Sequence, residues 1–412
     1  FWNCIYNTHT NSFISKHIEE IEKDDEYRQY VKVHSSAYED INIVRLMDME
    51  PEGELFDYQL CPMNKKRLED GMTELINKRW VLNKRPVGMP EDECWKLVEL
   101  PVPEIEEGNI LIKTLYLSID PYMRGRMNDA KSYADPIKLG EIMTGESVGM
   151  VIESKSDNFK VGDYVCAHRG WQSYIVAPGS DRQLFRADPD IVPLSTYLGT
   201  VGMPGRTAYF GLQRVGKPKA GETVVVSAAS GAVGTVVGQL AKILGCRAVG
   251  VAGGEMKCSY VTEELGFDAC VDYKAGNLEG DLKQACPNGI DIYFENVGAE
   301  VSKAVAKNLN PGARIPICGF IAHYNSTNFE NEETPFHVFG ALDPVPEHRF
   351  FVVTEWFEEW EEATKELSNW IKEGKIKYRE TVTEGLENAP QALRDVLTGK
   401  NFGKQVVKVA EQ

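Results

Sequence analysis

The stretch "TVVVSAASGAVGTVVGQLAKILG", residues 223–245, constrains the fold more than any other part of the chain. Its first residues form a continuous apolar run, which is typical of a parallel strand buried on both faces. After the glycines, Val236, Val237, Leu240 and Leu244 recur at helical spacing. A buried strand, a tight turn and an apolar helix predict the first unit of a Rossmann-type, doubly wound parallel sheet in an α/β protein.

The same alternation continues over about 205–355. Short connections separate strands over 246–252, 268–273, 289–298 and 312–319 from helices over 257–266, 278–286 and 301–309. Repeated βα units of this kind support the parallel sheet. Residues 354–375 follow with aromatic and aliphatic side chains every three or four positions, which predicts one long amphipathic helix.

Residues 72 to about 200 differ, because apolar runs and alternating segments are separated there by Gly and Asp. This pattern predicts a barrel-like β domain. The final "KQVVKV", residues 404–409, is typical of an edge strand, and we expect it to return to this first β domain. Residues 1–71 show a charged amphipathic helix but no readable chemistry, and we interpret them as an N-terminal extension or fusion remnant of unassigned fold.

Bulk properties exclude several classes of partner. A formal net charge of −17 repels phosphate backbones, so we expect no nucleic-acid partner. No apolar run is long enough for a membrane helix, and no secretory signal is visible, so we expect no membrane partner. The nine cysteines are widely spaced and form no C-x-x-C pair, which favours a reducing cytoplasm.

The turn itself departs from the dinucleotide fingerprint G-x-G-x-x-G, because Ala229 stands at the first glycine position. Alanine fits there if its φ stays negative. Gly231 would let the backbone approach a pyrophosphate, and Gly234 would let helix and strand pack closely. The free N–H groups at the helix start would then bind that pyrophosphate. The alternative is a tight turn without a ligand.

The end of the second strand indicates which nicotinamide cofactor fits. NAD-binding proteins place an acid there for the ribose hydroxyl, but this chain has Ala252, Gly253 and Gly254. Lys257 follows and can neutralise a 2′-phosphate, although Glu255 is a contrary signal. These residues favour NADPH; the alternative reading of Lys257 is a solvated lysine at a helix start.

A catalytic zinc site is not expected. Such a site needs three ligands from Cys, His or a carboxylate. The seven histidines are dispersed, and none is paired at helical spacing, so we predict no metal.

Six separated motifs in one order carry a specific resemblance: "LYLSIDPYMRGRM", "TGESVGMVIES", "GMPGRTAYFGL", "AASGAVG", "ENVG" and "GKNFGK". Over about 72–412 the chain resembles the zinc-independent medium-chain dehydrogenase/reductases, nearest to the NADPH-dependent alkenal/one reductases that act on prostaglandins, leukotrienes and curcumin. Gly145 stands where zinc-bearing relatives have histidine. The resemblance implies a GroES-like catalytic domain over 72–200 completed by 377–412, a Rossmann domain over 201–376, and a homodimer.

The resemblance also implies a cofactor site. Its residues by position are Gly231, Ala232, Val233, Gly234, Lys257, Tyr273, Asn296, Cys318, Gly319, Tyr324, Phe351, Val352, Val353 and Asn401. Structural readings stay open for three of them: Asn296 as a turn cap, Cys318 as a buried strand end and Tyr273 as surface packing.

Two tyrosines are candidate catalytic residues. Hydride addition to an enone builds negative charge on its carbonyl oxygen, which a positioned O–H stabilises. Tyr324 is the first candidate and Tyr122 the second; both can instead be walls of a substrate pocket. The sequence therefore predicts NADPH-dependent reduction of the C=C bond of α,β-unsaturated ketones or aldehydes. The alternatives are an NADPH quinone reductase and a non-catalytic NADPH-binding protein.

Overall fold

The computed structural model describes residues 75–130 and 132–411. Leu75–Gln412 form one compact unit. The helix and the extension expected within residues 1–71 lie outside the described residues. In the part of the chain that is described, no helix is both long and apolar enough to cross a membrane.

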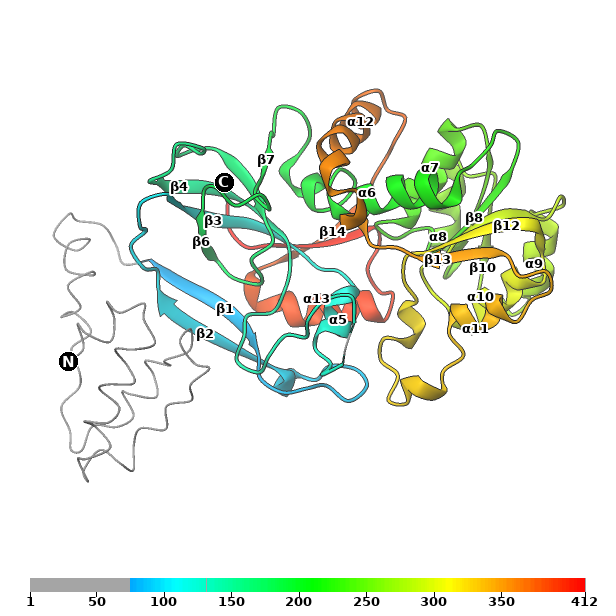
Figure 1. Ribbon diagram of the computed structural model, residues 1–412, viewed down its shortest axis with the longest axis horizontal. Helices are drawn as coiled ribbons and strands as arrows, with labels where there is room; N and C mark the ends of the chain where they lie inside the picture. The colour runs from blue at the N-terminus through cyan, green and yellow to red at the C-terminus, as the bar shows by residue number, and fades with distance from the viewer. Residues whose placement is uncertain (1–74, 131, 412) are drawn as a thin grey trace. The chain divides into compact units, whose positions relative to one another are not determined.

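A six-stranded parallel sheet forms the second half of this unit (Figure 1). Its strands lie in the order β10-β9-β8-β11-β12-β13. They are β8 Thr223–Ser227, β9 Arg247–Ala252, β10 Ala269–Asp272, β11 Ile290–Phe294, β12 Leu309–Ile317 and β13 Glu347–Phe350. The strand order reverses between β8 and β11. In sheets of this kind, ligands bind at the carboxyl ends of the two strands where the order reverses. The predicted doubly wound α/β fold is confirmed.

Helices cover both faces of this sheet. Val224 and Val226 of β8 point to one face, where they pack with side chains of α7 (Gly234–Ile243). Val225 points to the other face and packs with α9 (Leu278–Ala285) and α10 (Ala299–Ala306). Because successive side chains of a strand alternate between faces, an uninterrupted valine run serves both cores at once. The remaining helices beside this sheet are α6 Met203–Phe210, α8 Glu255–Ser259 and α11 Pro335–Gly340.

A second, largely antiparallel sheet consists of strands that precede the parallel sheet in the chain and of β14 and β15, which follow it. Its path is β14-β15-β3-β4-β5-β7, and β6 pairs with β3. The strands are β3 Asn109–Ser118, β4 Ser147–Ser154, β5 Tyr164–Ala167, β6 Tyr174–Pro178, β7 Phe185–Ala187, β14 Glu380–Glu384 and β15 Lys404–Lys408. A separate antiparallel pair consists of β1 Ile76–Leu82 and β2 Trp95–Pro101.

The chain's last strand is not an edge strand, contrary to the sequence expectation. β15 pairs with β3 on one side and with β14 on the other, so that β14 takes the edge. Lys404, at the start of β15, is buried and donates to Asp120 at 2.8 Å. Between β14 and β15 the chain forms α13 (Ala389–Leu397), which packs on Met123 and Trp171.

The prediction of one long helix over 354–375 is wrong for its first part. Val353–Glu359 is a 3₁₀ segment, and α12 begins at Trp360 and ends at Lys372. Trp356 interrupts the helix with φ −115° and ψ 31°. Its ring stacks on Phe210 with centroids 5.4 Å apart, so tertiary packing overrides the helical periodicity there.

Several shorter elements complete the description. The 3₁₀ turns are Asp92–Cys94, Leu194–Leu198, Ile321–His323, Phe329–Asn331 and Leu386–Asn388; the π-helical turns are Gly211–Gly216 and Tyr260–Glu264.

Candidate active site

The glycine turn between β8 and α7 is shaped by close backbone approach. A Cβ on Gly234 would lie 2.3 Å from the Ala228 carbonyl oxygen, and one on Gly231 would lie 3.1 Å from it. Ala228 takes the left-handed conformation, with φ +52°, while Ala229 stays outside it and is fully buried. Ala229, at the first fingerprint position, therefore has the negative φ that alanine needs there. The strained left-handed backbone conformation occurs one residue earlier, at Ala228.

The turn presents backbone donors at the start of α7. The Gly231 amide donates to the Ala228 oxygen and the Thr235 amide to the Gly231 oxygen. Among the described residues, the Val233 amide has no protein acceptor, while the Ala232 amide lies at the bridge between Gly231 and Gly403. Free N–H groups at the positive end of a helix dipole suit a phosphate. The turn therefore fits the pyrophosphate of a dinucleotide.

Lys257 lies beyond the end of β9, in the middle of the five-residue helix α8. Its ammonium donates to the backbone oxygens of Gly399 and Asn401, at 2.8 Å each. Burial lowers its pKa, and the charge of Lys274 lowers it further. A partly desolvated cation without a carboxylate partner among the described residues suits a phosphate dianion. Glu255, the contrary signal, is exposed at the start of α8.

The Tyr273 ring packs against Gly253, the residue that follows β9. A Cβ on Gly253 would lie 2.8 Å from its ring, and the side chain is 46% exposed. This contact explains why no acidic side chain occupies position 253. Asp272 ends the neighbouring strand β10, and its Oδ1 accepts from the Gly254 and Lys274 amides, which hold its pKa below the usual range.

The C-terminal segment crosses over the glycine turn. Gly403 forms a bridge with Gly231, and its amide donates to the Ser230 oxygen. The Asn401 side chain donates to the Gly403 oxygen at 3.0 Å. The structure thus brings Asn401 and Lys257 to the same turn, although they lie 144 residues apart.

Asn296 follows β11 and is tied to the end of β8. Its amide donates to the Ser227 hydroxyl, and its side chain donates to the Ser227 oxygen, at 2.8 Å each. Next to it, the fully buried Glu295 accepts from the Tyr293 hydroxyl and from the amides of Val297 and Gly298. Sequence reasoning missed Glu295, which fastens the carboxyl ends of β8 and β11 together.

Cys318, Gly319 and Tyr324 lie together after β12. Burial raises the pKa of the Cys318 thiol to about 12. A Cβ on Gly319 would lie 2.7 Å from the Tyr324 hydroxyl, so glycine makes room for that side chain. Burial also raises the pKa of Tyr324 above its ordinary value of 10. The hydroxyl therefore stays protonated at neutral pH and can donate.

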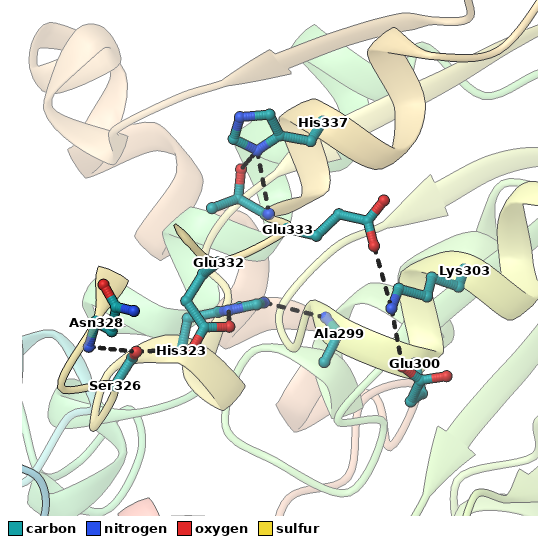
Figure 2. Close-up of polar contacts among 10 residues, drawn as sticks. Ala299, Glu300, Lys303, His323, Ser326, Asn328, Glu332, Glu333 and His337 are labelled. Atoms are coloured by element: carbon teal, nitrogen blue, oxygen red, sulfur yellow. Dashed lines mark hydrogen bonds and ion pairs between the residues drawn. The ribbon is translucent and has the colours of Figure 1, made fainter. Parts of the chain in front are cut away.

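A polar network holds the loop that carries Tyr324 (Figure 2). The buried His323 accepts from the Ala299 amide through Nε2 and contacts Glu332 through Nδ1 at 3.0 Å. Ser326 donates to the other oxygen of Glu332 at 2.7 Å. Because Nε2 accepts, Nδ1 carries the proton in this arrangement. The network fixes the turn immediately before Tyr324.

Tyr122 begins α5 (Tyr122–Arg126), and its buried hydroxyl forms no hydrogen bond of good geometry among the described residues, although the Thr144 side chain interacts with it. Its ring stacks on His168, with centroids 6.4 Å apart. Burial raises its pKa well above 10, and Asp120 adds to the effect. A cavity of about 360 Å³ is lined in part by His168 and Thr144, the two neighbours of this side chain, but Tyr122 itself is not among its lining residues. An unpartnered buried donor is costly for stability and therefore points to a ligand group as its partner.

Tyr133 is a third tyrosine of this group, and sequence reasoning missed it. Its ring lies 6.0 Å from that of Phe350, at the end of β13. Its side chain is 55% exposed, yet partial desolvation by the surrounding protein raises its pKa. Tyr133 in turn contributes to the raised pKa values of both Tyr122 and Tyr324. It lies in a loop without periodicity, so no sequence pattern marks it.

Residues 351–353, expected at the cofactor's carboxamide, already have several protein contacts. The Val352 amide donates to Glu355, and the Val353 oxygen accepts from the Trp360 indole. The Phe351 amide donates to the Ile317 oxygen at a long 3.3 Å. These bonds hold the segment against β12 and α12.

Arg124, within the motif that contains Tyr122, is a buried cation that forms no ion pair among the described residues. It is 1% exposed and donates to the Gly88 oxygen and to the side chains of Asn325 and Asn128. It therefore ties the motif that contains Tyr122 to the residue after Tyr324.

Within residues 75–130 and 132–411, no three or more His, Cys, Asp or Glu side chains gather closely enough to hold a metal ion. A Cβ on Gly145 would lie 3.0 Å from the Trp171 ring, so no larger residue fits there without movement. Glu146 is buried 3.9 Å from Arg206, and burial raises its pKa.

Two family models match the chain. The N-terminal domain of oxidoreductase matches residues 78–185, and the zinc-binding dehydrogenase model matches residues 232–368. The NADPH-dependent curcumin reductase of Escherichia coli is 46% identical over 343 residues, covering 82% of this chain and 99% of that protein. Prostaglandin reductase 1 of Oryctolagus cuniculus is 43% identical, covering 79% of this chain and 92% of the relative.

Solved structures agree with these matches. The crystal structure of CurA from Vibrio vulnificus in complex with NADPH has a TM-score of 0.76 and 44% identity, covering 81% of this chain and all of that one. The Escherichia coli quinone oxidoreductase in complex with NADPH has a TM-score of 0.65 at 19% identity, covering 80% of this chain and 99% of that one, and shares the fold.

Proposed function

The chain belongs to the medium-chain dehydrogenase/reductases, in the branch of the NADPH-dependent alkenal/one reductases, and we propose that it reduces the C=C bond of α,β-unsaturated ketones and aldehydes with NADPH. The observation that carries the proposal is the buried hydroxyl of Tyr122, whose hydrogen-bonding capacity the fold leaves largely unused, near Tyr133 and Tyr324. The identity with curcumin reductase and prostaglandin reductase 1 supports this substrate class.

The residues present fit NADPH. The amides of Ala232 and Val233 would hold the pyrophosphate, and Lys257 would exchange its backbone acceptors for the 2′-phosphate. Tyr273, Asn296, Cys318, Gly319, Asn401 and residues 351–353 would line the remaining length of the cofactor. When bound, NADPH supplies the hydride.

The tyrosines would act on the enone oxygen. Negative charge develops on that oxygen as the β-carbon is reduced, and a hydroxyl already aimed at it stabilises the charge without reorganisation. Tyr122 and Tyr324 remain neutral donors, because burial raises their pKa values. His168 and Thr144, 3.0 Å apart, would keep the Tyr122 ring in place.

The assembly we propose is a homodimer in a reducing cytoplasm. Among the described strands, β13 ends the parallel sheet and pairs only with β12, which leaves one side for a second copy. The described cysteines are all free thiols, as a reducing compartment would keep them. Light scattering of the purified chain should give twice the monomer mass; a monomer mass would contradict the dimer.

A panel of enones, enals and quinones, each assayed for NADPH oxidation with the full chain, tests the function. We expect enone and enal turnover with loss of the C=C bond. Preference for quinones would favour a quinone reductase instead. Tight NADPH binding without turnover of any of these compounds would favour a non-catalytic binding protein.

A further inference from the structure

Two cysteines that lie far from C-x-x-C spacing meet in the parallel sheet domain. Cys258 of α8 and Cys270 of β10 have their sulfur atoms 3.1 Å apart, both half-buried and both free. A disulfide needs a sulfur–sulfur distance of about 2.05 Å, so closing the pair requires a movement of roughly 1 Å. The pair is therefore poised for oxidation without being oxidised.

The two thiols differ in reactivity. The Cys270 thiol donates to Cys258, and this hydrogen bond lowers the pKa of Cys258. The same contact and burial raise the pKa of Cys270. Because the thiolate is the nucleophile, Cys258 is the attacking sulfur and Cys270 the resolving one.

The pair lies beside the residue expected to bind the 2′-phosphate. Lys257 directly precedes Cys258 and reaches the oxygens of Gly399 and Asn401. Drawing Cys258 toward β10 would turn the five-residue helix α8 and move the Lys257 ammonium. Formation of a disulfide would therefore affect the cofactor site directly, because Lys257 and Cys258 are joined by one peptide bond.

We propose that Cys258 and Cys270 form a peroxide-oxidisable dithiol whose disulfide weakens NADPH binding. The Cys258 thiolate attacks a peroxide oxygen, the O–O bond breaks, and a sulfenic acid and one water (after protonation) are formed. The Cys270 sulfur then attacks the Cys258 sulfur, its proton leaves with the hydroxide, and a second water is released. The dithiol loses two electrons, and the peroxide gains them.

The proposal rests on the proposed function only for the identity of the cofactor. The test therefore uses binding rather than turnover. The full chain is treated with hydrogen peroxide, its peptides are mapped by mass spectrometry, and NADPH and NADH affinities are measured by fluorescence before and after dithiothreitol. We expect a Cys258–Cys270 cross-linked peptide and NADPH binding weakened about tenfold, the effect of one lost charge-assisted hydrogen bond, with NADH unchanged and full reversal on reduction.

Variants make the assignment specific. Cys258→Ser and Cys270→Ser should each abolish the reversible loss of NADPH affinity, whereas Cys286→Ser, at a buried cysteine elsewhere in the same domain, should retain it. Absence of the cross-linked peptide, or a disulfide that leaves NADPH affinity unchanged, overturns the proposal. Equal loss of NADH affinity overturns the route through Lys257. Reduced protein that never binds NADPH would instead refute the proposed cofactor.

Discussion

At the scale of single residues, the site depends on groups whose ordinary partners are missing. The buried Tyr122 hydroxyl forms no hydrogen bond of good geometry within the described residues, and Lys257 has backbone oxygens where a cation usually finds a carboxylate. Each carries a desolvation cost that a bound ligand would offset. Both residues were predictable from the sequence, because they lie in motifs with local spacing. Tyr133 was not, because only the folded chain brings its loop to Tyr122 and Tyr324.

Lys257→Ala should weaken use of NADPH but not of NADH. Loss of a charge-assisted phosphate contact costs about 1.5–3 kcal/mol, which is at least about tenfold in KM. Steady-state kinetics with both cofactors measure this, with Lys283→Ala, an exposed lysine of α9, as the matched control. Equal losses with both cofactors would show that Lys257 only anchors the C-terminal segment.

Tyr122→Phe should lower kcat with little change in stability or NADPH affinity. The hydroxyl loses only a weak contact with Thr144 in the fold, while removal of an oxyanion donor costs about 10²–10³ in kcat. Tyr260→Phe is the matched control, because that hydroxyl is also buried and unpartnered but packs against Phe402. A kcat as high as that of the control would exclude Tyr122 from the chemistry.

The pH profile of kcat should follow the raised tyrosine pKa values. Burial disfavours the phenolate, so Tyr122 and Tyr324 keep their protons above pH 10, where an ordinary tyrosine has lost half of them. With NADPH and enone saturating, kcat should stay level up to pH 10 and fall only above it. A decline with its midpoint below pH 10 would mean that another group donates the proton.

At the scale of elements, the periodicity of the sequence predicted the helices and strands that are determined by contacts between residues close in the chain. The valine run of β8 and the helical spacing of α7 belong to one continuous stretch, and both formed where expected. The start of α12 did not, because Trp356 leaves the helix to stack on Phe210, more than a hundred residues earlier. The final strand was expected at an edge, but it pairs on one side with β14, which precedes it by one helix, and on the other with β3, far earlier in the chain.

Gly234→Ala should disrupt the turn between β8 and α7. Its Cβ would lie 2.3 Å from a backbone oxygen that cannot move independently, and overpacking of this kind costs about 1–3 kcal/mol. Urea unfolding should show this loss, together with weakened NADPH binding. Gly231→Ala, with 3.1 Å of clearance, should cost less stability. Equal stability of both variants would refute the packing role of Gly234.

At the scale of the whole molecule, the C-terminal residues join the two sheets of the described unit. β15 completes the largely antiparallel sheet, while the segment before it crosses the glycine turn of the parallel sheet. Six motifs spread over about 72–412 allowed the family to be identified from the sequence. How these motifs come together in one site could be seen only in the structure. Arg124, in the motif that contains Tyr122, donates to Asn325, which lies 201 residues later in the chain.

The central claim is that this chain moves a hydride from NADPH to the β-carbon of an enone. NADPH deuterated at the transferred position, incubated with the full chain and a simple enone, tests it directly by NMR of the product. The account predicts a saturated ketone with one deuterium at the β-carbon for each NADPH oxidised. An allylic alcohol, a product without deuterium, or no product from a folded chain that binds NADPH would contradict it.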